Sequence, residues 1–578
     1  MILQALNQYY ERKAVDPESG IAPDGFEYKE IPFVLVLDSR GTLVNVEDTR
    51  QSIHNKLRAR SFLVPQGEKR ASGIKAYLLW DNPEYLLGVP VKGKPERVKL
   101  QHREFVEKIR ALALSDDQGI NAVLRFLEGK PQEALIGSEH SDEILAAGPF
   151  MSFRLNTETQ LVCQRKAVLD RIAKYGDLEA RTGFCLVSGV TGRLARLQPA
   201  IKGVRGTNTT GGNIVSFNLS SFNSYGKEQG MNAPMAAKAS FAYTTALNHL
   251  LRKDSSQKLQ VGDATTVFWS DRSSHFEDDF ASLFDEPTKD NPDVLTEKVR
   301  SLLMAVNTGA IPPEDGITRF FILGLSPNSA RVSVRFWQVG TVADYTEKIA
   351  KHFQALSIVH APHQRDHLSI WWLLRSIAAL GKSENIPPNL AGDWMRSILS
   401  GGAYPQTLLS AAVRRIRAER EVSYERAAII KASLNLKARF QHQPQREITV
   451  SLDKDNHSPG YRIGRLFALL EKIQEEAHPG IKATIRDRYY AAASGTPASV
   501  LPILLRMKNH HLSKLEKGRA IYFEKLLQEV FEDISACGFP SQLSLDDQGR
   551  FAIGYYHQRQ AFFTRIEKAE PNIHEQGA

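Results

Sequence analysis

The sequence has little cysteine and no long hydrophobic run. Its 578 residues include three cysteines, Cys163, Cys185 and Cys537, which lie far apart and form no Cys-x-x-Cys pair. A disulfide framework is therefore excluded, and a zinc site built from thiolates is not expected. No stretch approaches the ~20 apolar residues that span a bilayer, and the first residues, MILQALNQYYERK, have no signal-peptide core. We expect a cytoplasmic protein with no membrane partner.

Two motifs of enzyme chemistry are absent or incomplete. The glycines between residues 203 and 212 are not followed by the Lys-Ser or Lys-Thr pair of a phosphate-binding P-loop. Ser72 and Lys75 have the spacing of a Ser-x-x-Lys nucleophile, but the companion motifs of acyl-transfer enzymes are missing. The sequence therefore predicts no catalytic residue and no cofactor.

Three histidines form the strongest candidate for a metal site. His360, His363 and His367 recur at spacings of three and four residues, which can place ligands on one helix face. Pro362 disfavours a continuous helix there, and no acidic cluster accompanies the histidines. We therefore expect surface or hydrogen-bonded histidines and no bound metal.

Positive charge is what the sequence does have. The 74 Lys and Arg residues exceed the 65 Asp and Glu residues, and the net charge of +9 favours an anionic partner, nucleic acid before a membrane surface. A solvated surface of paired charges is the alternative. Basic stretches such as AAVRRIRAER and TIRDRYY can follow a phosphate backbone. The candidate backbone contacts in them are Arg414, Arg415, Arg417, Arg486 and Arg488.

Two glycine-bearing loops add to this basic character. The stretch GVRGTNTTGGNIVSFNLSSFNSYGKEQG, residues 203–230, holds six glycines, and Lys202 and Lys227 bring charge to it. A second loop, QGEKRASGIKAY, spans residues 66–77. Glycine lets a backbone approach a groove or a phosphate closely because no Cβ intervenes. The two loops predict a shared nucleic-acid face, and a plain flexible surface loop is the alternative.

The hydrophobic periodicity divides the chain into two parts. IPFVLVLDSRGTLVNVEDTR predicts a hairpin, AYLLWDNPEYLLG two short strands, and VFWS and FFILGL buried strands. A helix is expected after Pro234. Beyond GKSENIPPNLAG, stretches such as GRLFALLEKIQEEA and IYFEKLLQEVFEDI predict amphipathic helices. The predicted fold class is α+β, an N-terminal mixed α/β domain followed by a C-terminal all-α helical bundle.

Several long motifs resemble one protein family. LLWDNPEYLLG, IKGVRGTNTTGGNIVSFN, SFNSYGKEQGMNAP, YRIGRLFALLEKIQ and FAIGYYHQRQAFF are similar to the large subunit of the type I-C CRISPR interference complex, the I-C Cascade. The resemblance runs from the first residue to about Phe563. It implies a non-catalytic subunit that recognises the protospacer-adjacent motif (PAM) in duplex DNA, aids strand separation and R-loop formation, and helps recruit a separate helicase-nuclease.

The resemblance also implies partners and a division of the chain. The partners are the guide RNA, the target double-stranded DNA and its displaced strand, the backbone, handle-binding and small subunits, and the helicase-nuclease. Residues 1–380 are expected to recognise the PAM and the guide handle, residues 381–450 to form a basic helical region, and residues 451–578 to form a bundle like the small subunit. A nuclease acting on nucleic acid and a purely architectural scaffold are the rival functions.

Residue chemistry places the candidate readers within the two loops. Related large subunits use a glycine-containing loop, a lysine and a glutamine- or asparagine-bearing wedge to read the minor groove. The Gly-flanked Gln229 and the nearby Asn232 are the wedge candidates, because a wedge must reach into the base stack. The PAM candidates are Lys69, Arg70, Ser72, Gly73, Lys75, Arg205, Thr207, Asn208, Gly211, Gly212 and Asn213.

Overall fold

The computed structural model describes most of the chain and divides it into two compact units. The described residues are 1–53, 56–67, 70, 73–174, 181–262, 264–284, 294–308, 316–387, 389–532, 534 and 538–563. Lys69, Ser72 and Cys537 lie outside them. The first unit comprises residues 1–203, 207–252 and 329–332, and the second comprises residues 204–206, 253–328 and 333–578.

A four-stranded sheet forms the core of the first unit within its described residues. Its order is β3-β2-β8-β7, with β2 and β3 antiparallel and β2 and β8 parallel. All five residues of β2, which lies between β3 and β8, are buried, so both faces of the sheet are covered at this strand. The predicted hairpin is therefore confirmed. The strands are Phe33–Leu37 (β2), Leu43–Asp48 (β3), Trp80–Asp81 (β7) and Met151–Leu155 (β8).

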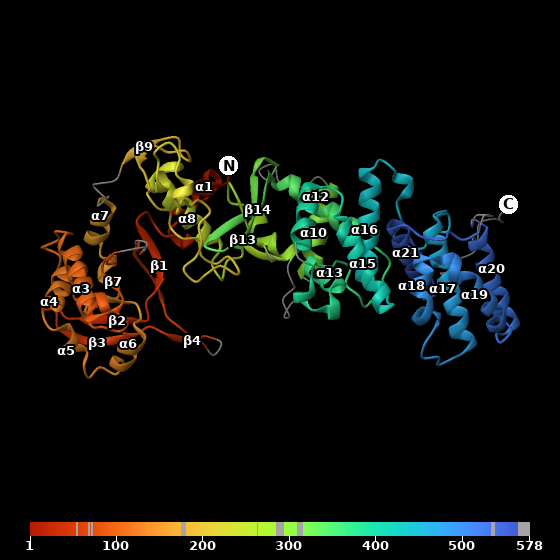
Figure 1. Ribbon diagram of the computed structural model, residues 1–578, viewed down its shortest axis with the longest axis horizontal. Coiled ribbons are helices and arrows are strands. Elements are labelled where there is room, and N and C mark those ends of the chain that lie inside the picture. Colours follow the sequence, from red (N-terminus) through yellow and green to blue (C-terminus); the bar gives the residue numbers. More distant parts are fainter. Residues whose placement is uncertain are drawn as a thin grey trace, which may run out of the picture. The chain divides into compact units, whose positions relative to one another are not determined.

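Helices pack beside this sheet in Figure 1, where they are drawn in orange to amber. Phe105 of α3 and Phe126 of α4 contact Phe153 of β8 with their rings, so the helices share one hydrophobic core with the sheet. The helices are Pro83–Leu86 (α2), Pro95–Arg110 (α3), Gln118–Glu128 (α4), Pro131–Leu135 (α5), Ser141–Ala147 (α6) and Lys166–Lys174 (α7).

The stretch 76–88 corrects one prediction. Only its first part is a strand, β7, and the second part is the helical turn α2. Asn82 accepts hydrogen bonds from the backbone N–H groups of Glu84 and Tyr85, and Pro83 occupies the first helical position. An asparagine cap followed by proline starts a helix, and this local signal outweighs the apolar composition that suggested a strand.

The rest of the first unit contains two packed helices and three short strand pairs within the described residues. Strand β1 (Phe26–Glu30) pairs with β6 (Ser61–Pro65), and helix α1 (Ile2–Ala14) packs against α8 (Ala237–Leu250). Helix α8 confirms the helix predicted after Pro234. The remaining short pairs are β4 (Gln51–Ile53) with β5 (Lys56–Arg58) and β9 (Thr182–Phe184) with β10 (Thr191–Arg193).

The second unit begins with an antiparallel sheet of order β11-β12-β13-β14 in its described part. Every residue of β12 is buried, and the strands predicted from VFWS and FFILGL are confirmed as β12 and β13. Phe268 and Phe320 from this sheet join the same core as Ile349 of α12. The elements are Lys258–Val261 (β11), Ala264–Ser270 (β12), Arg319–Asn328 (β13), Arg331–Thr341 (β14), Phe276–Asp279 (α9), Val294–Thr308 (α10) and Val342–Leu356 (α12).

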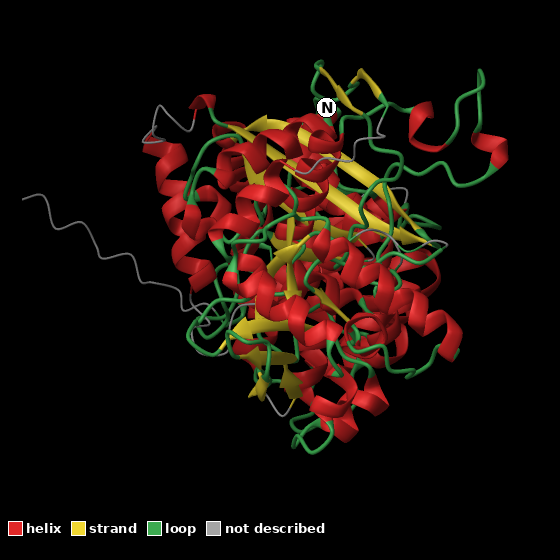
Figure 2. Ribbon diagram, turned by 90° about the vertical axis from the view of Figure 1, so that its left-hand side faces the viewer, coloured by secondary structure: helices red, strands yellow, loops and turns green. Residues whose placement is uncertain are grey.

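Helices alone make up the described elements from residue 370 onward (Figure 1). Figure 2 draws the helices of the chain in red and its strands in yellow. The helices predicted from GRLFALLEKIQEEA and IYFEKLLQEVFEDI are confirmed as α17 and α20, and so is the α+β fold class. The single apolar stripe predicted for α17 is wrong, because every residue from Gly460 to Glu471 is buried between neighbouring helices. The predicted boundaries at residues 381 and 451 lie inside this unit and stay predictions. The helices are Ile370–Ile377 (α13), Leu390–Ser400 (α14), Gln406–Glu419 (α15), Tyr424–Phe440 (α16), Pro459–Ala477 (α17), Ile485–Gly495 (α18), Pro497–Leu512 (α19), Lys517–Phe531 (α20) and Leu545–Ala561 (α21).

Two of these helices, α17 and α21, approach each other unusually closely. A Cβ atom added at Gly464 would lie 2.1 Å from the carbonyl oxygen of Phe551, and one added at Gly554 would lie 2.1 Å from that of Tyr461. Only glycine permits such backbone contact. The glycines of YRIGR and FAIGYY therefore serve helix packing.

Candidate nucleic-acid interface

Most of the net charge lies in one segment of the chain. Residues 181–252, which we call the basic segment, contain eight Lys or Arg residues and a single acidic residue, Glu228, so they carry +7 of the total +9. A surface with so few carboxylates attracts phosphate groups and releases their counterions when it binds them. The basic residues are Arg181, Arg193, Arg196, Lys202, Arg205, Lys227, Lys238 and Arg252.

The glycines of this segment make close contacts with the protein's own backbone. Ile201 and Gly212 exchange two backbone hydrogen bonds of 2.8 and 2.9 Å, which close the loop between them. A Cβ at Gly211 would lie 2.5 Å from the carbonyl oxygen of Ile201, and Gly211 has a φ of 84°. Thus Gly211 and Gly212 are required for closing the loop, and a contact of theirs with nucleic acid stays a prediction.

The predicted readers from Arg205 to Asn213 fall into two classes. Asn213 is buried, and its side-chain amide donates to the carbonyl oxygens of Gln198 and Pro199 at 3.1 and 2.8 Å. Arg205 and Asn208 are exposed, and Thr207 is half-buried. Asn213 therefore anchors the loop, whereas Arg205 and Asn208 lie where a ligand can reach them.

The second predicted loop is held in place by Arg70. Its Nε donates to the carbonyl oxygen of Lys75 at 2.7 Å, and its guanidinium lies 3.8 Å from the ring centre of Tyr77 and 4.1 Å from that of Tyr85. It also pairs with the fully buried carboxylate of Asp81. Burial raises the pKa of Asp81, and the Arg70 charge opposes that rise. These contacts assign Arg70 a structural role in the loop.

Gly73 and Lys75 complete the described part of this loop. Gly73 is exposed with a φ of 84°, and no atom lies within 4 Å of the position that its Cβ would take. Lys75 is half-buried. The carbonyl oxygen of Gly73 accepts a hydrogen bond from Arg97 at 3.4 Å, whereas the open side at its Cβ position permits close approach of another backbone.

Lys29, which the sequence analysis did not select, lies beside both loops. Its Nζ is 4.2 Å from the ring centre of Phe150 and 5.7 Å from that of Trp80, and Trp80 stacks on Tyr77 at 4.5 Å. Burial lowers the pKa of Lys29, and the positive charge of Lys202 lowers it further. The structure therefore brings Lys202, from the start of the glycine-rich stretch, within electrostatic reach of the aromatic cluster under the second loop.

The side chains of both wedge candidates form hydrogen bonds with neighbouring residues of the protein. Gln229 accepts a hydrogen bond from Arg196 at 2.7 Å. Asn232 accepts one from the backbone N–H of Ser224 at 3.2 Å and donates to the carbonyl oxygen of Gln229 at 3.1 Å. Insertion of Gln229 into a base stack would require breaking its bond to Arg196.

The five arginines predicted on helices differ in their contacts. Arg415 pairs with Glu419 at 2.9 Å, and Arg486 lies 3.7 Å from the buried Glu471. Arg414 and Arg488 are exposed, and among the described residues the structure shows no ion pair for either. These two are the helix arginines best placed to meet a phosphate.

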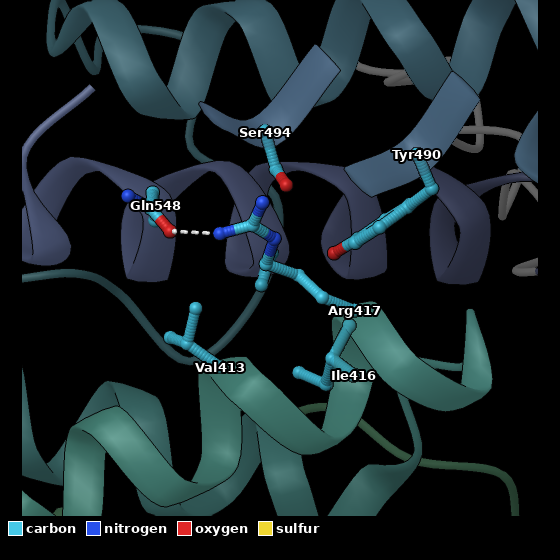
Figure 3. A pocket seen from close by; sticks show the side chains of 7 residues that line it. Val413, Ile416, Arg417, Tyr490, Ser494 and Gln548 are labelled. Atoms are coloured by element: carbon cyan, nitrogen blue, oxygen red, sulfur yellow. Dashed lines mark hydrogen bonds between the residues drawn. The ribbon is translucent and has the colours of Figure 1, made fainter. Parts of the chain in front are cut away.

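Arg417 lies in a small pocket between three helices. Figure 3 shows its guanidinium beside Ser494 of α18 and Gln548 of α21, with a 3.4 Å hydrogen bond to the amide oxygen of Gln548. The ring of Tyr490 lines the same pocket. Burial raises the pKa of Tyr490, and the charge of Arg417 opposes that rise. Arg417 thus contributes to helix packing as well as to surface charge.

Among the residues that the structure describes, no group of three or more His, Cys, Asp or Glu residues is arranged to hold a metal ion. His360 lies 3.7 Å from Asp366, and burial lowers the pKa of His367.

No helix in the described ranges is both long and apolar enough to cross a membrane.

One comparison with known proteins identifies a relationship. The protein-family model described as CRISPR-associated protein (Cas_Csd1) matches residues 6–563, which is nearly the whole chain. No curated protein matches the sequence.

Proposed function

Because the chain belongs to the CRISPR-associated Csd1 family, a family of Cascade-type proteins, we propose that it is the large subunit of a type I-C surveillance complex. In this role it binds the PAM-bearing duplex, aids strand separation and R-loop formation, and helps recruit a helicase-nuclease. The observation that carries the proposal is the basic segment, with eight basic residues and one acidic residue in 72.

The proposed division of labour follows from the chemistry of the two loops. Exposed Lys202, Arg205 and Lys227 meet phosphates, which position the duplex without reading its sequence. The backbone of Gly73 and the side chain of Asn208 are proposed to approach base edges, because both are exposed. Pairing between guide and target then supplies most of the sequence specificity.

The helical region contributes a second, weaker contact. Arg414 of α15 and Arg488 of α18 are exposed. We propose that they bind the phosphate backbone of the displaced DNA strand. The proposed partners are the guide RNA, the target DNA with its displaced strand, the other Cascade subunits and the helicase-nuclease. The subunit is proposed to bind without cutting, and cleavage of target DNA by the purified subunit with Mg²⁺ or Mn²⁺ would instead support the nuclease alternative.

Binding of a target duplex by the assembled complex tests this proposal. Replacing Lys202 and Arg205 by Ala is expected to weaken binding on the order of tenfold for matched and unmatched PAM sequences alike, because the lost contacts are to phosphates. The matched control replaces Lys99 and Lys130, whose side chains are 72% and 76% exposed and each of which pairs with a glutamate. Equal binding by all three complexes would contradict the proposal.

A further inference from the structure

A tyrosine stands at the tip of a tight turn in the basic segment. Ser224 and Lys227 face each other in an antiparallel bridge, and the backbone N–H of Lys227 donates to the carbonyl oxygen of Ser224 at 2.9 Å. Tyr225 and Gly226 form the turn between them. The side chain of Tyr225 is 97% exposed, the highest value among the exposed large hydrophobic residues of the described chain.

The backbone at this tip is one that tyrosine rarely adopts. Tyr225 has a φ of 52° and Gly226 a φ of 68°. Turns with positive φ at both central residues favour Gly, Asn and Asp, since a Cβ is strained there. A bulky side chain in that position is explained neither by turn formation nor by packing, and such strain is typical of a functional contact.

The chain on either side of the turn is held by contacts within the first unit. On the N-terminal side, Arg331 donates to the side-chain oxygen of Asn218 at 3.0 Å and lies 4.6 Å from the ring centre of Phe222. On the C-terminal side, the N–H of Gly230 donates to the carbonyl oxygen of Arg196 at 3.0 Å. Because both ends are anchored, the ring of Tyr225 projects from a supported base.

The surroundings of the ring favour a nucleic acid over a protein groove. The residues from Asn223 to Glu228 are all exposed, and Tyr225 is the one apolar side chain among them. Docking into a protein normally uses a contiguous apolar patch, which this turn does not provide. Lys227 lies two residues away, within a segment of net charge +7. An isolated aromatic ring within a basic surface is the arrangement that binds unpaired bases.

We infer that Tyr225 stacks on an unpaired nucleobase. The inference rests on the proposed function, because it concerns a nucleic acid bound at the same segment. It assigns the stacking contact to Tyr225 and leaves Gln229 in its bond with Arg196. The base belongs either to target DNA where the duplex opens or to an unpaired part of the guide RNA, and both present the same π face.

The test compares complexes assembled with Tyr225→Phe, Tyr225→Leu and Tyr225→Ala. The fluorescent base 2-aminopurine is placed in the target DNA beside the PAM in one arm and in the unpaired guide RNA in the other. We expect wild type and Tyr225→Phe to quench the probe in one arm. The Leu and Ala variants are expected to lose the quenching, and the affinity or opening rate falls about 5- to 150-fold, the value of one stacked base.

The aliphatic variant separates stacking from an apolar contact. If Tyr225→Leu behaves like wild type while Tyr225→Ala does not, the ring docks on a protein and the inference is wrong. If all variants match wild type in both arms while the wild-type complex still binds its target, the inference is wrong and the proposed function stands. Tyr28→Ala, at a tyrosine 48% exposed, is the matched control and is expected to change neither arm.

Discussion

The basic segment and the C-terminal helices both carry Lys and Arg, but they differ in the acidic residues available to pair with them. In the helices, Arg439 pairs with Glu447 at 2.7 Å and Arg559 with Glu475 at 2.8 Å. The basic segment holds Glu228 alone against eight cations. The number of basic residues in a region therefore does not measure the charge available to a partner. Removing a cation should cost stability in the helices and nucleic-acid affinity in the basic segment.

The largest effect is expected at Arg465 of α17. Its side chain is 1% exposed, bonds to Gln558 at 3.1 Å and pairs with Glu529 at 2.5 Å. Glu529 keeps its ion pair with Lys454 at 2.8 Å, but Arg465→Ala removes one of the largest fully buried side chains, leaves a cavity and breaks the bond to Gln558. The free energy of unfolding should therefore fall by about 3–5 kcal/mol. Urea unfolding measures this. Lys202→Ala in the basic segment serves as the contrast, with a change expected within about 0.5 kcal/mol.

The next effect is an acid sensitivity of the helical region. Burial lowers the pKa of His557 from its usual 6.5 to about 3, and Tyr461 lies 2.9 Å from its ring nitrogen. Between these pKa values the unfolded chain binds a proton that the folded chain does not. The contribution of His557 to the free energy of unfolding is therefore complete above pH 6.5. As the pH falls below that value, the free energy of unfolding decreases by about 1.4 kcal/mol per pH unit.

The variant His557→Gln isolates this contribution. Denaturant unfolding of wild type and variant at a series of pH values from 7 to 4 gives the two slopes. A shallower pH dependence in the variant is expected. Parallel curves would mean that His557 does not titrate differently in the folded and unfolded states.

A smaller effect is expected where helices touch. Gly464→Ala places a Cβ 2.1 Å from the carbonyl oxygen of Phe551, so α17 and α21 must move apart, and stability should fall by about 1–3 kcal/mol. Gly518→Ala in α20 is the matched control, because no atom lies within 4 Å of its added Cβ. Thermal unfolding that ranks the control as the less stable variant would contradict the packing role.

The smallest effect on stability, and the one opposite in sign, is expected at Tyr225. Asparagine tolerates positive φ better than tyrosine does, so Tyr225→Asn should leave stability unchanged or raise it by up to about 1 kcal/mol. Thermal unfolding of the purified subunit measures this change. A clear loss of stability would show that the ring packs on the protein and that the positive φ of Tyr225 does not strain the fold.

Local patterns predicted several elements of the fold. The hairpin of β2 and β3, the buried strands β12 and β13, and the helices α17 and α20 follow from periodicity in short windows. The second strand expected between residues 76 and 88 is a helical turn, because Asn82 caps it and Pro83 occupies its first position. Nearby residues thus determine these elements, and the errors are also local.

The candidate site was less predictable, because its contacts join distant residues. Lys29 owes its environment to Phe150, far along the chain, and Arg70 is held by the buried Asp81. A sequence shows a basic residue but not the carboxylate or ring beside it. The charge of the basic segment could have been found by counting acidic residues in windows, whereas the exposure of Tyr225 needed the structure.

The salt dependence of target binding tests the central claim most directly. The complex with Lys202, Arg205 and Lys227 replaced by Gln is compared with wild type in the slope of log affinity against log salt. Three lost phosphate contacts should reduce the magnitude of that slope by about 2 to 3. The control replaces the exposed and paired Lys99, Arg103 and Lys130, and its slope should equal that of wild type. An unchanged slope in the first variant, or an equal reduction in both, would contradict the account.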